Sequence, residues 1–259
     1  MARAALIGHT GFVGSNLARQ FAFDATYNSR NIEAIAGERF EELVFSGAQA
    51  KKWWANQNPE EDWAGIERAL AALETVEAEK VTLISTIDVA VPGAGLDEAA
   101  DYSSGQPHAY GVNRRRLEDA FRERFPGCLI VRLPGLFGRG LKKNVIYDLL
   151  EGNMLEKINP ESRFQYYDLE RLKNDLTLAR GAALTLAHLV TEPVATSEII
   201  ARFFPEAAVG ADAAPFGEYD FRTLHADVFG GAGEYIEMKE SVLDRMGAFI
   251  ERWRAGEKE

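Results

Sequence analysis

Residues 4–17 read AALIGHTGFVGSNL, in which Gly8, Gly11 and Gly14 follow a short apolar run at intervals of three. The apolar run is typical of a buried strand, and the residues after Gly11 have the spacing of a helix. Glycine at a strand-to-helix turn lets backbone N–H groups approach a pyrophosphate with no Cβ between them, and the helix N-terminus adds unpaired donors. The stretch therefore predicts a dinucleotide site. We assign it to Gly8, Thr10, Gly11, Phe12, Val13 and Gly14.

Short apolar runs alternate with longer amphipathic runs through the first half of the chain. After ALIG, the sequence predicts strands at ELVFSGA, KVTLIST and CLIVRLP, with ATYNSR and IEAIA as candidate short strands. FVGSNLARQFAF, EEDWAGIERALAALETV and NRRRLEDAFRERF are predicted helices. Such alternation implies right-handed crossovers and a mainly parallel sheet. The predicted fold class is α/β, a Rossmann-type doubly wound parallel sheet with a small C-terminal substrate-binding region.

The chain has 259 residues, enough for a core domain with a smaller appendage. We expect a dinucleotide-binding core at residues 1–134 and a smaller substrate-binding region at 135–259, with elements that are free to pack back on the core. LKKNVIYDLLEGNML, DLERLKNDLTLARGAALTLAHL and ESVLDRMGAFIERWR have helical patterns. ATSEIIARFF is a further candidate helix, for which Thr196 or Ser197 is the expected cap.

The composition narrows the class of protein. A formal net charge of −11 argues against a nucleic-acid partner, and no apolar run approaches membrane-spanning length. The single cysteine, Cys128, lies in an apolar stretch and is expected to be buried, and the N-terminal residues lack a signal pattern. We therefore expect a cytoplasmic protein that binds a small-molecule substrate. No Cys, His and Asp spacing predicts a metal, and the oligomeric state, a homo-oligomer included, stays open.

Four motifs occur in order along residues 1–200: GHTGFVGSNL, LISTIDVA, AYGVNR and RLPGLFGRG. Together they resemble the extended short-chain dehydrogenase/reductase family, whose members are NAD(P)-dependent and epimerase/dehydratase-like. The resemblance implies hydride transfer between a nicotinamide and a carbon that bears oxygen. It also implies a Ser or Thr after a central strand, followed by Tyr-x-x-x-Lys on the next helix.

At these positions the chain has Thr86, Tyr110 and Arg114. The resemblance makes Tyr110 the proton carrier and Thr86 the residue that orients the reacting oxygen, with Ser85 as the near alternative. Arg114 replaces the family lysine, which binds the nicotinamide ribose and lowers the tyrosine pKa. Tyr110 and Arg114 are four residues apart on a predicted helix, so they share one face. The alternative for Arg114 is a solvated basic face, shared with its neighbours Arg115 and Arg116, that pairs with Glu118 and Asp119.

Two further positions concern the cofactor and the substrate. Asn28, Ser29 and Arg30 fall where NAD enzymes carry an acidic residue, which favours NADP, with NAD as the alternative and an ordinary polar loop as the other interpretation. Pro134 follows the strand expected to flank the nicotinamide. Gly135 stands where sugar-nucleotide epimerases usually have Asn. The sequence thus predicts an NAD(P)-dependent oxidoreductase or epimerase acting on a sugar-like or small carbonyl substrate; the alternative is a non-catalytic dinucleotide-binding sensor or scaffold of the same fold.

Overall fold

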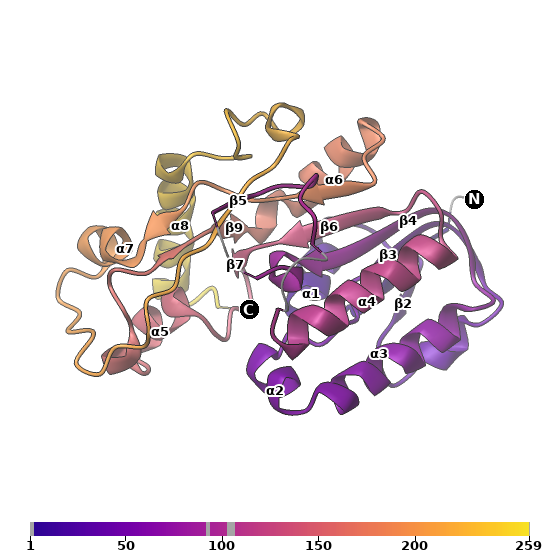
Figure 1. Ribbon diagram of the computed structural model, residues 1–259, viewed down its shortest axis with the longest axis horizontal. Helices are drawn as coiled ribbons and strands as arrows, with labels where there is room; N and C mark the ends of the chain where they lie inside the picture. The colour runs from indigo at the N-terminus through magenta and orange to yellow at the C-terminus, as the bar shows by residue number, and fades with distance from the viewer. Residues whose placement is uncertain (1–2, 92–93, 103–106, 259) are drawn as a thin grey trace. The chain divides into compact units, whose positions relative to one another are not determined.

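The computed structural model describes residues 3–91, 94–102 and 107–258 (Figure 1). The chain divides into two compact units. The first consists of Met1–Val91, Asp101–Arg132 and Leu172–Ala187, and the second of Pro92–Ala100, Leu133–Arg171 and His188–Glu259. The segment at 172–187 follows the predicted boundary at residue 134 and belongs to the first unit.

The first unit is built on a six-stranded sheet in the order β10-β6-β4-β3-β1-β2. The strands are β1 (Ala4–Ile7), β2 (Ala25–Tyr27), β3 (Arg39–Phe45), β4 (Glu77–Thr86), β6 (Leu129–Leu133) and β10 (Leu186–His188). β1 pairs in parallel with β2 and with β3, and β3 pairs in parallel with β4. The predicted Rossmann-type α/β fold is confirmed. Because the chain leaves β1 for β2 on one side and returns to β3 on the other, the topological switch point lies at β1, where doubly wound sheets bind ligands outside the carboxyl ends.

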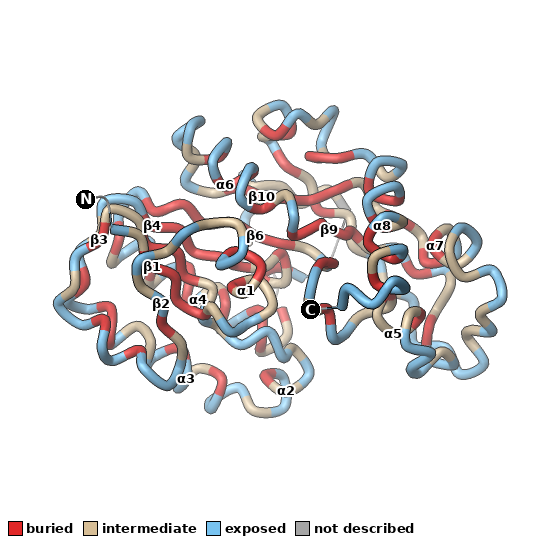
Figure 2. Tube along the Cα trace, turned by 180° about the vertical axis from the view of Figure 1, so that it is seen from behind, coloured by how far each residue is buried: buried red, intermediate tan, exposed pale blue. Residues whose placement is uncertain are grey.

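Helices cover both faces of this sheet (Figure 1). Ala5 and Ile7 of β1 join a buried cluster with side chains of α3 (Pro59–Leu73) and α4 (Ala109–Arg124). Leu6, between them, faces the opposite layer because successive strand side chains alternate. There α1 (Phe12–Gln20) and α6 (Leu172–Gly181) contact each other. Figure 2 shows buried residues running along the central strands. The unit also contains α2 (Lys52–Gln57) and the 3₁₀ turns η1 (Ile32–Ile35) and η2 (Ile87–Val89).

The second unit contains short two-stranded ladders and helices. β7 (Gly135–Phe137) pairs in parallel with β9 (Tyr166–Asp168), β8 (Arg163–Phe164) pairs antiparallel with β11 (Val194–Ala195), and β12 (Asp220–Phe221) pairs in parallel with β5 (Ala94–Leu96). The helices are α5 (Val145–Glu151), α7 (Thr196–Phe203) and α8 (Lys239–Arg254), with 3₁₀ turns η3 (Leu155–Lys157), η4 (Leu169–Arg171) and η5 (Ala226–Phe229). α8 buries its apolar face, and the Phe249 ring lies 5.7 Å from that of Phe137 between centroids.

Three sequence-based assignments are wrong. IEAIA forms the 3₁₀ turn η1 and not a strand, so Ile32 and Ile35 are buried on one side of a tight helical turn. The helical pattern predicted through LTLAHL ends at Gly181, a turn follows, and Leu186–His188 form strand β10, which contains the buried His188. Neither Thr196 nor Ser197 caps α7. The cap is Ala195, whose backbone N–H donates to Glu198 Oε2 at 2.9 Å.

Within the described parts of the chain, every helix is too short or too polar to cross a bilayer.

Candidate functional site

The three glycines of the first turn have different surroundings. Gly8 has a φ of +90°, and a Cβ built on it would lie 2.4 Å from the carbonyl oxygen of Ser46, which follows β3. A Cβ on Gly14 would lie 2.0 Å from Gly8 O. A Cβ on Gly11 would meet only Gly8 O, at 3.3 Å. Close packing therefore requires glycine at 8 and 14, whereas a side chain at 11 would require Gly8 O to shift by only a few tenths of an ångström.

Gly11 is also the N-cap of α1, at the carboxyl end of β1. Its φ of −80° and ψ of 169° are extended, and its carbonyl accepts the first helical bond, from Ser15 N at 2.8 Å. No side chain caps this helix end, and its first turn contains no acidic residue. The first backbone N–H groups of a helix lack intrahelical partners and carry the positive end of the dipole. The turn can thus receive an anionic group, and the residues present fit a pyrophosphate.

The turn after β2 lies against the glycine turn. Gly8 N donates to Tyr27 O at 2.7 Å, and the His9 ring contacts the same oxygen through Nδ1 at 3.0 Å. Asn28 shapes the turn by accepting from Arg30 N at 2.9 Å. Ser29 and Arg30 are exposed there. The structure therefore brings the predicted 2′-phosphate residues next to the predicted pyrophosphate turn.

Tyr110 lies in the first turn of α4 and is 8% exposed. Its backbone N–H donates to Asn56 Oδ1 of α2 at 2.9 Å. The next residue is Gly111, on which a Cβ would lie 2.0 Å from Asp88 O of η2. The Tyr-Gly pair of AYGVNR thus fixes the start of α4 against both α2 and the turn that follows Thr86.

Arg114 lies beneath the Tyr110 ring, with its guanidinium carbon 4.3 Å from the ring centroid. Its Nη1 and Nη2 donate to the two carboxylate oxygens of Asp62 in α3, at 2.8 and 3.0 Å, and Nη2 also donates to Gln49 O at 2.5 Å. The side chains of Arg114 and Asp62 are 3% and 2% exposed. The predicted shared face with Tyr110 is present, and Asp62 is a partner of Arg114 that the sequence pattern does not reveal.

Arg115 and Arg116 differ from the solvated face expected of them. Arg115 donates to Val89 O through Nε and Nη2, at 3.1 and 2.6 Å. Arg116 is exposed but stacks on Trp63, 3.5 Å from the ring centroid. Glu118, the expected partner, is fully buried and binds Arg132 at 2.6 Å instead. A buried carboxylate requires paired donors, which explains why Glu118 turns inward to Arg132.

The ionisation of Tyr110 is set by opposing effects. Burial raises the pKa of its hydroxyl, Arg114 and Lys52 lower it, and Asp88 raises it, so that the net pKa stays above the ordinary value of 10.0. Arg114 thus acts in the direction expected from the sequence. The structure does not show the lowered Tyr110 pKa that the resemblance implies, because desolvation outweighs the nearby cations.

The two hydroxyl candidates after β4 have separate partners. Thr86 Oγ1 accepts from Asp88 N at 3.2 Å and caps η2. Ser85 Oγ donates to Glu118 Oε1 at 2.6 Å in the buried network with Arg132. A hydroxyl that accepts one bond keeps its own hydrogen for donation. Thr86 therefore remains the better candidate for a residue that orients a substrate oxygen.

A charged group beside Tyr110 was missed from the sequence. Lys52 Nζ of α2 donates to Asp88 Oδ1 at 2.8 Å, and His108 Nε2 lies 3.7 Å from the same oxygen. Burial raises the pKa of Asp88, but His108 and Lys52 lower it, and the net pKa lies below the ordinary value. His108 Nδ1 accepts from Gly111 N at 3.2 Å as the N-cap of α4. Lys52 and Asp88 are 36 residues apart, and no spacing in the sequence relates them.

Pro134 and Gly135 lie in the second unit, at the start of β7. Pro134 is partly buried, and its assignment to the nicotinamide stays a prediction. A Cβ on Gly135 would lie 2.8 Å from Gln165 O, just before the paired strand β9. The close backbone approach therefore explains why this chain has no Asn at 135.

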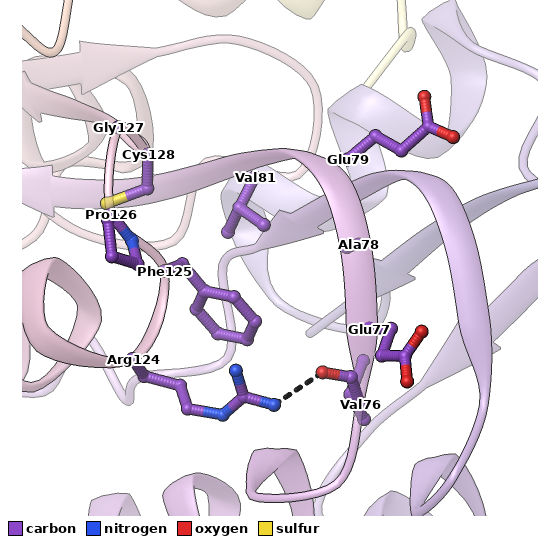
Figure 3. A pocket seen from close by; sticks show the side chains of 10 residues that line it. All are labelled: Val76, Glu77, Ala78, Glu79, Val81, Arg124, Phe125, Pro126, Gly127 and Cys128. Carbon is purple, nitrogen blue, oxygen red and sulfur yellow. Dashed lines mark hydrogen bonds between the residues drawn. The ribbon is translucent and has the colours of Figure 1, made fainter.

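A hollow of about 270 Å³ opens at the amino end of β4, lined also by the connection from α4 to β6 (Figure 3). Arg124 Nη2 donates to Val76 O there, at 2.6 Å. Cys128 lines it, buried as expected, and burial raises the pKa of its thiol. Ligands of doubly wound sheets bind at the carboxyl ends of the strands, so this hollow is not part of the candidate site.

No protein-family model and no curated protein matches the chain. Solved structures do match it over nearly the whole length. One is UDP-N-acetylglucosamine 4-epimerase from Methanobrevibacter ruminantium M1, with a TM-score of 0.77 and 12% identity, where the match covers 98% of this chain and 99% of the epimerase. Another is MoeE5 in complex with UDP-glucuronic acid and NAD, with a TM-score of 0.75 and 14% identity, where the match covers 98% of this chain and 100% of MoeE5. TunA, an NAD-dependent NDP-hexosamine 5,6-dehydratase, has a TM-score of 0.73 and 16% identity, with 98% of both chains covered. The chain thus shares the fold of a nucleotide-sugar epimerase and of an NAD-dependent dehydratase, and the resemblance drawn from its motifs is confirmed at the level of the fold.

Proposed function

We propose that the protein is an NAD(P)-dependent oxidoreductase or epimerase of the extended short-chain dehydrogenase type. The observation that carries this proposal is Gly11. A Cβ there would make one tight contact, with Gly8 O at 3.3 Å, which a shift of a few tenths of an ångström relieves, and this glycine is the N-cap of α1 at the topological switch point. A bound pyrophosphate accounts for that glycine, because a side chain would fill the space that the phosphate oxygens need. The fold shared with a UDP-N-acetylglucosamine 4-epimerase and with an NAD-dependent dehydratase supports the same conclusion.

In this proposal the dinucleotide, when bound, supplies the hydride chemistry. Tyr110 donates a proton to the reacting oxygen or removes one from it. Thr86 donates a hydrogen bond that orients that oxygen, and Arg114 holds the Tyr110 ring from below, at 4.3 Å. The substrate would carry a hydroxyl or carbonyl group on the carbon that exchanges hydride.

The cofactor proposal is NADP, with NAD as the alternative. Ser29 and Arg30 are exposed after β2, and a hydroxyl with a guanidinium suits a 2′-phosphate. NAD is the dinucleotide named for TunA and present in the MoeE5 complex.

The fold and residue 135 together indicate which class of substrate the protein accepts. The solved structures include enzymes of nucleotide sugars, and a sugar-like substrate follows from that likeness. Gly135 cannot be replaced by Asn without moving the β7–β9 pair, since its Cβ position lies 2.8 Å from Gln165 O. The chain therefore lacks the Asn that sugar-nucleotide epimerases usually carry, which favours a smaller carbonyl or sugar substrate.

A second candidate function is a non-catalytic dinucleotide-binding sensor or scaffold. Two observations favour it. Arg114 directs its terminal nitrogens to Asp62 and Gln49 O, and the pKa of the buried Tyr110 is raised. A sensor needs neither a ribose-binding cation nor a tyrosine with a lowered pKa.

The experiment that separates the two is a turnover assay. Nucleotide sugars, simple sugars and small carbonyl compounds are screened against oxidation of NADPH and NADH, and any active substrate is then tested with Tyr110→Phe. We expect turnover to fall by about 10²–10⁴-fold, the usual range for loss of a proton-transfer group, while cofactor affinity is kept. Wild-type turnover in Tyr110→Phe would overturn the catalytic assignment, and the absence of turnover with every compound would favour the sensor.

A further inference from the structure

The orientation of Thr86 depends on η2, the 3₁₀ turn that follows it. Thr86 Oγ1 accepts from Asp88 N at 3.2 Å, and a backbone bond from Ala90 N to Ile87 O, also at 3.2 Å, closes the turn. A turn of three residues makes too few hydrogen bonds of its own to offset the entropy lost in ordering it. Contacts with neighbouring elements must therefore hold η2, and with it the Thr86 hydroxyl, in place.

Helix α4 contacts η2 at two positions on one face. A Cβ on Gly111 would lie 2.0 Å from Asp88 O, so the two backbones lie in direct contact there. Four residues further along α4, Arg115 donates to Val89 O through Nε at 3.1 Å and through Nη2 at 2.6 Å. Residues four apart on a helix lie one above the other. The glycine allows the close approach, and the arginine adds a directional bond at the end of the turn.

The bond to Val89 O is in a place where its loss matters. Val89 is 0% exposed, so water competes little for its carbonyl oxygen. A guanidinium makes a charge-assisted bond, and a buried acceptor deprived of its donor carries a desolvation cost. Lys52 also holds η2, but through the partly exposed side chain of Asp88, at 2.8 Å. That ion pair leaves the backbone at Val89 to Arg115.

We propose that Arg115 is a positioning residue for Thr86. By holding Val89 O, it keeps η2 in the conformation in which Asp88 N donates to Thr86 Oγ1, and the hydroxyl hydrogen of Thr86 stays available to a ligand oxygen. Arg115 acts through this turn and not by contact with a substrate. The bearing of this role on catalysis rests on the proposed function. Adjacent positions of α4 then support the two candidate residues, since Arg114 lies beneath the Tyr110 ring.

The test measures amide hydrogen exchange in η2 by NMR at neutral pH, in the protein without cofactor or substrate. In Arg115→Met we expect the Asp88 and Ala90 amides to exchange about tenfold faster or more, the size expected for a lost bond to a charged group. Arg115→Lys keeps one charged donor and should restore part of the protection. Arg116→Met, which removes the exposed neighbouring arginine, should leave both rates unchanged.

Unchanged exchange of the Asp88 and Ala90 amides in Arg115→Met would overturn the inference, and so would an equal acceleration in Arg116→Met. The amide of Val44, buried in β3, is the internal reference. An equal acceleration at Val44 would also overturn the inference, because the substitution would then lower the stability of the whole unit and not of η2 in particular.

These exchange rates need no ligand, so they are independent of the proposed function. A wild type that binds no dinucleotide would remove that function and leave the effect of Arg115 on η2 measurable. Where a substrate turns over, kcat should fall in Arg115→Met while KM and cofactor affinity stay nearly unchanged, because the Thr86 bond to the reacting oxygen strengthens in the transition state. Arg115→Lys should recover part of kcat, and Arg116→Met should keep all of it.

Discussion

Asp62 and Arg114 form a buried ion pair in which each carboxylate oxygen accepts from one terminal guanidinium nitrogen, Oδ2 from Nη1 at 2.8 Å and Oδ1 from Nη2 at 3.0 Å. The pair joins α3 to α4 at the level of Tyr110. Asp62 also accepts from Asn113 Nδ2 at 2.9 Å, so three donors converge on one carboxylate. This geometry makes position 114 a structural support of the candidate site as well as a charge within it.

Removing Arg114 from this ion pair should lower the stability of the protein. Arg114→Met leaves the Asp62 carboxylate buried without its main partner, and we expect the free energy of unfolding to fall by about 3–5 kcal/mol. Urea unfolding followed by circular dichroism measures the change. Arg116→Met is the matched control, because that exposed arginine only stacks on Trp63, and it should cost less than about 1 kcal/mol. Equal losses in the two variants would show that the Asp62–Arg114 pair adds nothing to stability.

Cofactor choice should depend on Arg30. Its guanidinium is exposed beside the glycine turn, so Arg30→Ala should remove a charge-assisted bond to the 2′-phosphate. We expect NADPH affinity to fall by about tenfold or more, as for a lost bond to a charged group, with NADH affinity nearly unchanged. Calorimetry with both dinucleotides measures the ratio. Arg19→Ala removes the same charge from the exposed end of α1 and should leave that ratio as it is; a wild type that binds both dinucleotides equally would refute the preference.

Asp168 should give the stability of the chain a distinct pH dependence. Burial raises its pKa to about 6, although Arg245 Nη1 lies 3.8 Å away and acts in the opposite direction. The folded state therefore keeps this proton between about pH 4 and 6, where the unfolded chain has lost it. The stabilising contribution is complete below pH 4 and is lost as the pH rises through 6, by about 2–3 kcal/mol.

Asp168→Asn should remove this contribution, since the amide resembles the protonated acid and its oxygen can still accept from Glu170 N, as Asp168 Oδ1 does at 3.0 Å. The measurement is the free energy of unfolding at pH 4 and pH 7 in both proteins. The variant should gain stability relative to wild type at pH 7 and not at pH 4. Asp227→Asn, at an exposed position, is the control. Parallel curves for wild type and Asp168→Asn would contradict the prediction.

The sequence was sufficient for the features that depend on local pattern. The glycine spacing after a four-residue apolar run predicted the β1–α1 turn, because tight backbone approach leaves few residue choices. The strand predicted at IEAIA is wrong. Ile is typical of strands, but the three-residue spacing of Ile32 and Ile35 places both on one side of a 3₁₀ turn. Gly181 is the last residue of α6 and indicates where the helix ends before β10, whereas the sequence-based prediction continued the helix through it.

The remaining features depend on contacts between distant segments. Arg114 binds Asp62 from 52 residues away, and Lys52 binds Asp88 from 36 away. Neither distance produces a periodic pattern, so no sequence argument reaches either pair. The burial that raises the pKa of Tyr110 is likewise a property of how α2, η2 and α4 pack. The motifs therefore predicted which residue types occupy the site, whereas their ion-pair partners and the pKa of Tyr110 depend on tertiary contacts.

The central claim is that the glycine turn binds a dinucleotide, and calorimetry with NADPH and NADH on Gly11→Val tests it most directly. Circular dichroism first establishes that the variant is folded, because the new Cβ meets Gly8 O at 3.3 Å and that oxygen must shift by a few tenths of an ångström, although the backbone at 11 is extended. Gly65→Val is the matched control, since it places the same side chain in open space on α3. We predict that wild type and Gly65→Val bind a dinucleotide with similar affinity while folded Gly11→Val shows no measurable binding. Undiminished affinity in folded Gly11→Val, or no binding by the wild type, would contradict the account.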